Sequence, residues 1–453
     1  MSNSAASITQ KSGEHLTWTN NTNLIIFAFS LVFYGRILTT VTPAPAILVH
    51  AHFIFVPLVL WIVLATAPQQ NPYQIKLVRS LLTRLFILFL AILASALWNG
   101  AGFINAIASF AILGEPVMFL TAIVYIPLSE DSFSRIQRWF MGSVLINFLL
   151  AAVQKPLIDA GKIEGYGFDG TDGCGGVFYV SGAGNYISAS VSIAFAIYFL
   201  VNGKKFPLWV RIAALLAAFW QILFSDSKQI VFAYTVAWIF LIIFNFKDIG
   251  KTIKLLLGIA IVGFAFFWCV QNLEAFSGFA AWARPDLYGK HGDAWFTKFY
   301  SLKAILTEFD SWGNWLFGLG PGHTVSRLGA WFLQDYHWML EPLGATTTSI
   351  GTESRAFISN FWLAYSSSMF SPIFGWLGIW GDIGLVGLGV YFYLAHSIWQ
   401  HFSLDNSLKI TMLSILVMGF IFTQVEEPGY MLSVALLLGI AWHKKRLKFT
   451  QPQ

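Results

Sequence analysis

Long apolar runs dominate the chain, and short polar segments separate them. Runs of about 17–25 residues can cross the roughly 30 Å hydrocarbon layer of a bilayer as helices. These runs are apolar on all sides rather than along one stripe, as lipid-facing helices require. They lie near residues 24–42, 47–66, 84–100, 103–127, 138–154, 186–202, 208–225, 229–246, 252–270, 373–400, 408–422 and 429–443. The pattern predicts an all-α polytopic membrane protein of about 12 transmembrane helices.

The basic residues of the tails and short loops predict the orientation of these helices. Seventeen of them fall on one side of the predicted membrane, whereas the short loops of the other side hold only Lys155, Lys162 and Lys228. The positive-inside rule places the richer side in the cytoplasm. An even number of spans then places both termini there as well.

The predicted topology divides the chain at its polar segments. The divisions are a cytoplasmic N-terminal tail (1–23), transmembrane helices 1–9 (24–271), a large extracytoplasmic loop (272–372), transmembrane helices 10–12 (373–443) and a basic cytoplasmic tail (444–453). The large loop contains a segment with helical periodicity, residues 295–309, so we expect it to be partly helical and folded. A second outer loop, residues 161–184, is rich in glycine, and we expect it to be irregular.

The composition agrees with a membrane protein. The chain of 453 residues is 57% hydrophobic and 11% charged, whereas soluble domains carry about 25% charged residues. Its net charge of +5 does not indicate nucleic-acid binding, because the basic residues form no continuous face and no RNA-binding signature occurs. The two cysteines, Cys174 and Cys269, have no zinc or redox spacing. Two free thiols are favoured over a disulfide between them.

Ionisable residues inside apolar runs are costly and need a partner or a task. Arg36 lies within the first run and Glu115 within the fourth, and a structural ion pair between them is favoured over a substrate contact. Asp382 lies within the tenth run, between Gly381 and Gly384. A packing or capping role and a functional role are both open for this aspartate.

Two outer segments could contact an anion. Lys228 follows Asp226 in a tight turn, where it can offer a cation at the membrane surface or pair with Asp226 itself. Gly318, Gly320 and Gly322 can adopt positive φ, and successive backbone amides can bind an anion. For these glycines a simple tight turn is the favoured interpretation.

The sequence predicts no metal site and no cofactor. It contains no HExxH, GxSxG, EF-hand or DxD motif. The nearest acidic pair, Glu308 and Asp310, is interpreted as the solvated end of a helix.

The order of these features resembles the bacterial O-antigen ligase and O-antigen polymerase superfamily, which transfers lipid-linked oligosaccharides. The resemblance covers about residues 170–390. The segment 224–228 is similar to the family's turn before the eighth helix, with Lys228 in the place of an arginine. The segment 316–322 (LFGLGPG) is similar to the family's "fGxGpG" segment. Lys298 lies where the family often places a loop arginine, and Arg284 competes for that position.

A third segment distinguishes the members of this superfamily. Ser371, followed by Gly381 to Gly384, resembles the motif that opens the tenth helix. Ligases place a histidine just before that serine or asparagine, whereas this chain has Phe370. The departure favours a polymerase, in which that histidine is not a fixed feature.

The resemblance implies a polymerase of surface polysaccharide in the bacterial inner membrane, with a periplasmic large loop. It would transfer glycan from a polyprenyl-diphosphate-linked oligosaccharide to the hydroxyl of a second glycan, without a metal. Ligase-type transfer to a different acceptor and a polysaccharide-lipid flippase or transporter are the alternatives. A chain-length regulator or a flippase of the same pathway would be its protein partner.

This chemistry needs cations for the diphosphate leaving group and a group that aligns the acceptor hydroxyl and takes its proton. The candidate cations are Lys228, Arg284, Lys298, Arg327 and Arg355. The candidate bases are Glu353, His337 and His323. Glu353 is favoured, because the tripeptide from Glu353 to Arg355 couples a proton acceptor to a phosphate-binding group. The alternative for this tripeptide is a surface ion pair.

Overall fold

All regular elements of the described residues are helical in the computed structural model. The structure describes residues 2–67, 71–164, 174–179, 183–244, 249–273, 276, 279, 285–289, 292–363 and 375–450. Half of the Gly-rich outer loop predicted over residues 161–184, namely residues 165–173 and 180–182, lies outside these ranges.

Each predicted apolar run overlaps one long helix. These helices are α1 (Ser2–Val41), α2 (His52–Thr66), α3 (Pro72–Trp98), α4 (Phe103–Tyr125), α5 (Glu130–Asp159), α6 (Gly184–Asn202), α7 (Leu208–Phe224), α8 (Lys228–Phe244), α9 (Ile249–Asn272), α18 (Gly375–Phe402), α19 (Asn406–Met418) and α20 (Pro428–Thr450). Short turns η1 (Ala46–His50), η2 (Gly176–Phe178) and η7 (Thr423–Glu426) lie between them.

Seven helical segments among the described residues are long and apolar enough to cross a membrane. They are Asn21–Val41, Ala46–Thr66, α3, α4, α5, α6 and α18. The apolar helices α7, α19, Lys228–Ile243 and Leu256–Asn272 are shorter. The chain is therefore an all-helical membrane protein over its described part, and the number of 12 spans stays a prediction.

Three helices begin well before the apolar runs that predicted them, and one of them, α1, already begins at Ser2 within the predicted N-terminal tail. Helix α3 begins at Pro72, after an N-cap in which the Asn71 side chain accepts a hydrogen bond from the Tyr73 amide at 2.9 Å. Helix α5 begins after Ser129, which accepts from the Ser132 amide at 3.2 Å. Asparagine and serine satisfy the free amides of a helix start, so both helices extend beyond the apolar part through polar turns.

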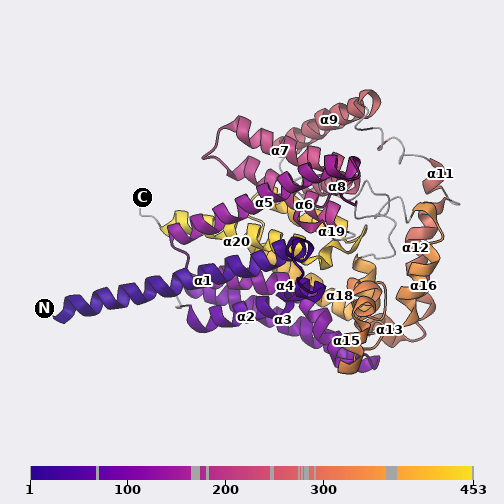
Figure 1. The fold of residues 1–453 in the computed structure, drawn as a ribbon, viewed down its shortest axis with the longest axis horizontal. Helices are drawn as coiled ribbons and strands as arrows, with labels where there is room; N and C mark the ends of the chain where they lie inside the picture. The colour runs from indigo at the N-terminus through magenta and orange to yellow at the C-terminus, as the bar shows by residue number, and fades with distance from the viewer. Residues whose placement is uncertain are drawn as a thin grey trace.

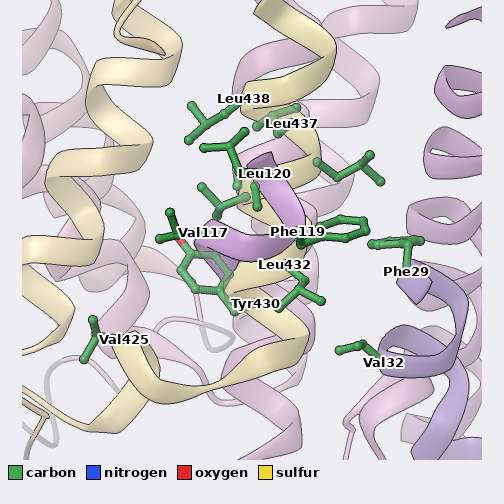
Figure 2. Close-up of a cluster of buried hydrophobic side chains, with 14 of the residues drawn as sticks. Phe29, Val32, Val117, Phe119, Leu120, Val425, Tyr430, Leu432, Leu437 and Leu438 are labelled. Atoms are coloured by element: carbon green, nitrogen blue, oxygen red, sulfur yellow. The ribbon is translucent and has the colours of Figure 1, made fainter. Parts of the chain in front are cut away.

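Helix α4 lies at the centre of the bundle. It packs against α2, α3 and α20, and most of its length is buried. Figure 2 shows the core where α1, α4 and α20 meet, with Phe29, Phe119 and Leu432 directed toward one another. Helices α2 and α5 are largely exposed along their apolar lengths, as expected of helices that face lipid.

The described residues between α9 and α18, from 285 to 363, form a separate layer at one end of the bundle. We call the described residues 285–289 and 292–363 the cap. Its elements are α11 (Pro285–Tyr288), α12 (Asp293–Thr307), α13 (Trp312–Phe317), η4 (Leu328–Phe332), α14 (Leu333–Asp335), α15 (His337–Leu340), η5 (Glu341–Leu343) and α16 (Ser349–Ile358). Figure 1 shows α11, α12, α13, α15 and α16 at one end of the molecule and both chain termini toward the other.

The cap confirms two expectations about local structure. Helix α12 overlaps the helical segment predicted over residues 295–309, and it begins and ends two residues earlier. Glu308 is the exposed C-cap residue of that helix, as expected of a solvated helix end.

Candidate functional site

Asp382 of α18 holds the cap against the membrane helices through hydrogen bonds. This buried aspartate of α18 accepts hydrogen bonds from the backbone amides of Gly322 (2.7 Å) and Thr324 (2.9 Å). It also accepts from the hydroxyls of Thr324 (2.6 Å) and Ser326 (2.5 Å). Four donors compensate the cost of burying one carboxylate, so Asp382 fixes the position of the segment 322–326. Of the two roles open from the sequence, the contacts describe the packing role.

Glycines allow this close approach of the cap to α18. Gly318 has φ 73° and ψ −159°, and Gly384 has φ 65° and ψ −170°, a region open essentially to glycine alone. A Cβ atom at Gly318 would lie 2.5 Å from the carbonyl carbon of Asp382, and one at Gly384 would lie 2.3 Å from the carbonyl oxygen of Leu316. The two glycine-containing segments therefore pack directly on each other.

The backbone amides of the cap glycines all have partners within the protein. Those of Gly318, Gly320 and Gly322 donate to the Asn314 carbonyl (2.7 Å), the Asp382 carbonyl (3.0 Å) and the Asp382 carboxylate (2.7 Å). Gly320 and Gly322 also have positive φ, at 106° and 75°. The segment is a tight turn whose amides hold α18, so they are not directed at an external anion.

Arg327 follows this turn and is directed into a buried charged cluster. Its guanidinium forms an ion pair with Glu427, and Arg36 of α1 lies 4.0 Å from the other carboxylate oxygen of Glu427. The side chains of Arg327, Arg36 and Glu427 are 6%, 13% and 3% exposed. Two arginines from opposite parts of the chain thus converge on one carboxylate beneath the cap. We call Arg36, Arg327, Glu426 and Glu427 the arginine cluster.

Glu426 completes the cluster with a different kind of partner. Its carboxylate accepts a hydrogen bond from the Arg327 backbone amide at 3.3 Å. Burial raises the pKa of Glu426 to about 8, and the nearby Asp382 charge raises it further. The Arg327 amide and guanidinium lower this pKa, but their effect is smaller than that of burial. Burial also lowers the pKa of Arg327 to about 10, so the guanidinium stays charged at neutral pH.

Histidines and a tyrosine surround the arginine cluster. His50 contacts the Tyr336 hydroxyl through Nε2 at 3.1 Å, and His52 contacts Glu115 through Nδ1 at 2.8 Å. The prediction that Arg36 pairs with Glu115 is therefore wrong, because the connection before α20 brings Glu427 to Arg36 while His52 of α2 occupies Glu115.

The arginine cluster is closed to large molecules in this conformation. A cavity of about 10 Å³ lies among Arg36, His50, His52, Arg327 and Glu427, which is room for one water molecule. A second cavity of about 10 Å³ borders Asp382 and Glu426. A ligand larger than water can reach the guanidinium groups only after the cap or the Glu427 side chain moves.

Lys228 and Lys298 lie on segments linked to the same end of the bundle. Lys298 of α12 donates to the carbonyl oxygen of Ile421, next to Phe422, whose ring packs on Tyr186 with centroids 4.3 Å apart. Tyr186 in turn interacts electrostatically with Arg327 and Arg36. These contacts connect Lys298 to the surroundings of the arginine cluster.

The α7–α8 turn joins this network through α6. Asn185, the neighbour of Tyr186, donates to the Ser225 carbonyl at 3.1 Å. Lys228, three residues further on, pairs with Asp226 and lies 5.9 Å from the Phe279 ring centroid. Of the two arrangements open for Lys228, the pair with Asp226 is the one observed, at the end of the bundle that carries the arginine cluster.

Burial also affects the other lysine, Lys298, and lowers its pKa to about 7.

The other candidates lie apart from the cluster or outside the described residues. Glu353 and Arg355 are exposed on α16. His337 is partly exposed, and its Nδ1 lies 3.2 Å from the Glu341 carboxylate. His323 is buried, and its ring nitrogens contact the Leu319 carbonyl (2.8 Å) and the Thr346 hydroxyl (2.7 Å), so its ring bridges two parts of the cap.

Arg284, Phe370 and Ser371 lie outside the described residues. Both cysteines are free thiols, as expected.

Sequence reasoning missed Glu426 and Glu427. The sequence could have indicated them, because two adjacent acidic residues precede Pro428 between two apolar runs. An unpaired charge at such a position is costly, so a basic partner is expected. Pattern alone cannot say which basic residue they meet.

The fold and the arginine cluster together define an all-helical membrane protein with a buried ionic site under a cap. Among the described residues, no three His, Cys, Asp or Glu side chains are grouped so that they could hold a metal ion. The chain matches no protein-family model and no curated protein. The residues of the site therefore carry the functional proposal.

Proposed function

We propose that this protein is a polymerase of bacterial surface polysaccharide that uses a polyprenyl-diphosphate-linked oligosaccharide as its donor. The observation that carries the proposal is the convergence of Arg36 and Arg327 on the Glu427 carboxylate. Two guanidinium groups that share one anion have the charge and the forked donor geometry that a diphosphate requires. The order of sequence motifs similar to the O-antigen polymerases adds support.

In the proposed reaction the diphosphate takes the place of the Glu427 carboxylate between the two arginines. The acceptor hydroxyl oxygen forms a bond to the anomeric carbon of the donor sugar, and the bond from that carbon to the diphosphate oxygen breaks. The polyprenyl diphosphate leaves with the electron pair, and its negative charge is stabilised by the guanidinium groups. Lys298 and Lys228 supply further positive charge from the same end of the bundle.

The hydroxyl proton passes to a carboxylate in this proposal. Glu353 is exposed on α16, where an acceptor glycan outside the membrane can reach it. A base has to lie within hydrogen-bonding distance of the hydroxyl, so movement of the cap relative to the cluster would accompany binding. The large loop lies in the periplasm and both termini lie in the cytoplasm.

A reconstituted transfer reaction tests the role of the arginines. Purified protein in detergent is incubated with the lipid-linked donor, and products are sized on a gel. We expect Arg327→Gln and Arg36→Gln each to lower turnover by about 100-fold or more, because each removes a donor to the leaving group. Arg138→Gln is the matched control, since Arg138 is exposed on α5.

The outcomes separate the alternatives. A ladder of products supports a polymerase, whereas a single addition to a different acceptor indicates a ligase. A flippase would form no glycosidic bond in detergent. Arg327→Lys keeps the positive charge but loses the two parallel N–H donors of the guanidinium, so we expect it to retain partial activity. Wild-type turnover in both folded glutamine variants would refute the diphosphate site.

A further inference from the structure

A cavity distinct from the arginine cluster lies within the membrane helices. It has a volume of about 660 Å³ and is bounded by α4, α18, α19 and α20, with Leu241 of α8 at its side. Its lining is mostly aliphatic and aromatic, including Leu120, Leu416 and Leu438. The volume is within the range of small-molecule sites, and the apolar lining suits a hydrocarbon chain. Phe392 of α18 lines the cavity and is 38% exposed, so the cavity reaches the outer surface of the helices.

One end of this cavity is polar and positively charged. Lys409, in the first turns of α19, lines the cavity together with Ser403 and His396. The nearby Asp405 carboxylate is engaged, because it accepts from the Leu408 amide (3.0 Å), the Asn202 side chain (2.8 Å) and the Ser407 hydroxyl (2.5 Å). No acidic side chain in the described part of the chain forms an ion pair with Lys409.

This polar end lies at the opposite end of the bundle from the cap. Lys444 of the C-terminal segment donates to the Asn202 carbonyl at 2.7 Å, and Asn202 donates to Asp405. The exposed cations Lys204 and Lys205 follow Asn202 in the chain, and the exposed cation Lys445 follows Lys444. Clusters of basic residues at a membrane surface attract anionic lipids.

We propose that this cavity binds an anionic glycerophospholipid. One acyl chain occupies the apolar part between α18, α19 and α20, and the phosphate pairs with Lys409 at the membrane surface. A donor held by the arginine cluster has its diphosphate at the other end of the bundle, so this lipid is a separate ligand. The proposal does not depend on the transferase reaction.

Native mass spectrometry of the purified protein tests the site. Delipidated protein is titrated with phosphatidylglycerol or phosphatidylcholine, and bound lipids are counted. Wild type binds one phosphatidylglycerol more tightly than phosphatidylcholine. Lys409→Gln weakens phosphatidylglycerol binding about fivefold, the factor expected for one lysine near an anionic surface, and leaves phosphatidylcholine unchanged. Lys303→Gln, at an exposed position of α12 in the cap, is the matched control and binds as wild type.

Filling the cavity tests the acyl-chain part separately. Ala435→Trp and Ala395→Phe place bulk in the cavity, and both reduce binding of either lipid. Leu385→Trp, on an exposed face of α18, leaves it unchanged. The proposal is overturned if Lys409→Gln and Lys303→Gln bind phosphatidylglycerol equally, or if the variants with a filled cavity bind lipid as the wild type does. Tighter binding of polyprenyl phosphate than of phosphatidylglycerol by the wild type, lost in Ala435→Trp, also overturns it, because the carrier lipid would then be the occupant.

Discussion

Three buried carboxylates at the junction of cap and bundle have three different kinds of partner. Asp382 accepts four hydrogen bonds, Glu427 pairs with two arginines, and Glu426 accepts one backbone hydrogen bond at 3.3 Å. The cost of burying an ionised carboxylate falls as donors and cations compensate it. Glu426 is the least compensated of the three, which is consistent with its pKa of about 8.

The raised pKa of Glu426 predicts a pH-dependent stability. The folded protein holds this proton up to about pH 8, whereas an unfolded glutamate releases it near pH 4.5. The stabilisation is complete below pH 4.5 and is lost as the pH rises through 8. We expect the melting temperature of Glu426→Gln minus that of wild type to increase by about 2 °C or more between pH 6 and pH 9.

The measurement is tryptophan fluorescence during heating in detergent at each pH. Lys298 titrates near pH 7 and acts in the opposite direction, since its lowered pKa makes folding more favourable as the pH rises from 7 toward 10.5. Subtracting the wild-type curve removes that contribution. Glu308→Gln, at the exposed end of α12, provides the control; a parallel pH dependence in Glu426→Gln and wild type would contradict the prediction.

At the scale of elements, the contact between the cap turn and α18 depends on glycine. Gly318→Ala places a methyl group against the Asp382 backbone in a conformation that costs about 1–3 kcal/mol before the clash is counted. We expect this variant to unfold at a distinctly lower temperature and to expose the cap to limited proteolysis.

A second glycine of α18, outside this contact, supplies the control. Gly389 lies within α18, and a Cβ atom there meets nothing within 4 Å. Alanine favours a helix over glycine by about 1 kcal/mol, so Gly389→Ala should match or exceed the wild-type stability. Equal stability of the two alanine variants would show that the turn does not need glycine.

Helix positions were predictable from the sequence, and most of their exact starts were less so. Every apolar run of bilayer length falls on a helix, because no other backbone structure satisfies its own hydrogen bonds inside hydrocarbon except a closed barrel. The runs missed the polar first turns of α3 and α5, although Asn71 with Pro72 and Ser129 with Glu130 are recognisable start signals. Hydropathy identifies the apolar part of a helix but not the polar residues at its start.

At the scale of the whole molecule, the arrangement of termini and cap predicts their accessibility. Both termini lie toward the end of the molecule away from the cap elements (Figure 1). In a background that carries Cys174→Ala and Cys269→Ala, we expect a membrane-impermeant maleimide to label Asp310→Cys in intact spheroplasts. Lys445→Cys should be labelled only after permeabilisation.

Both exposed positions should react in detergent, which controls for local accessibility. Labelling of Lys445→Cys in intact spheroplasts would reverse the proposed orientation. Equal protection of both positions would contradict an extracytoplasmic cap.

The arginine cluster was only partly predictable. Arg327 was a candidate because it is a cation in the large loop, and Arg36 because it interrupts an apolar run. Their common partner Glu427 is far from Arg36 in the sequence and depends on how α1, the cap and α20 meet in three dimensions. The geometry of long-range packing, which hydrophobic periodicity does not encode, decides that Glu115 meets His52 instead.

The order of these anchors along the chain has a consequence for biosynthesis. A ribosome delivers the cap before it delivers Asp382, and Glu427 emerges later still. Until α18 and α20 have inserted, the cap segment lacks the acceptor of its glycine turn and Arg327 lacks its counter-ion. A nascent chain released early would therefore expose a cap without its contacts to quality-control proteases. The helices that are synthesised last supply the contacts that hold the cap, which is synthesised before them.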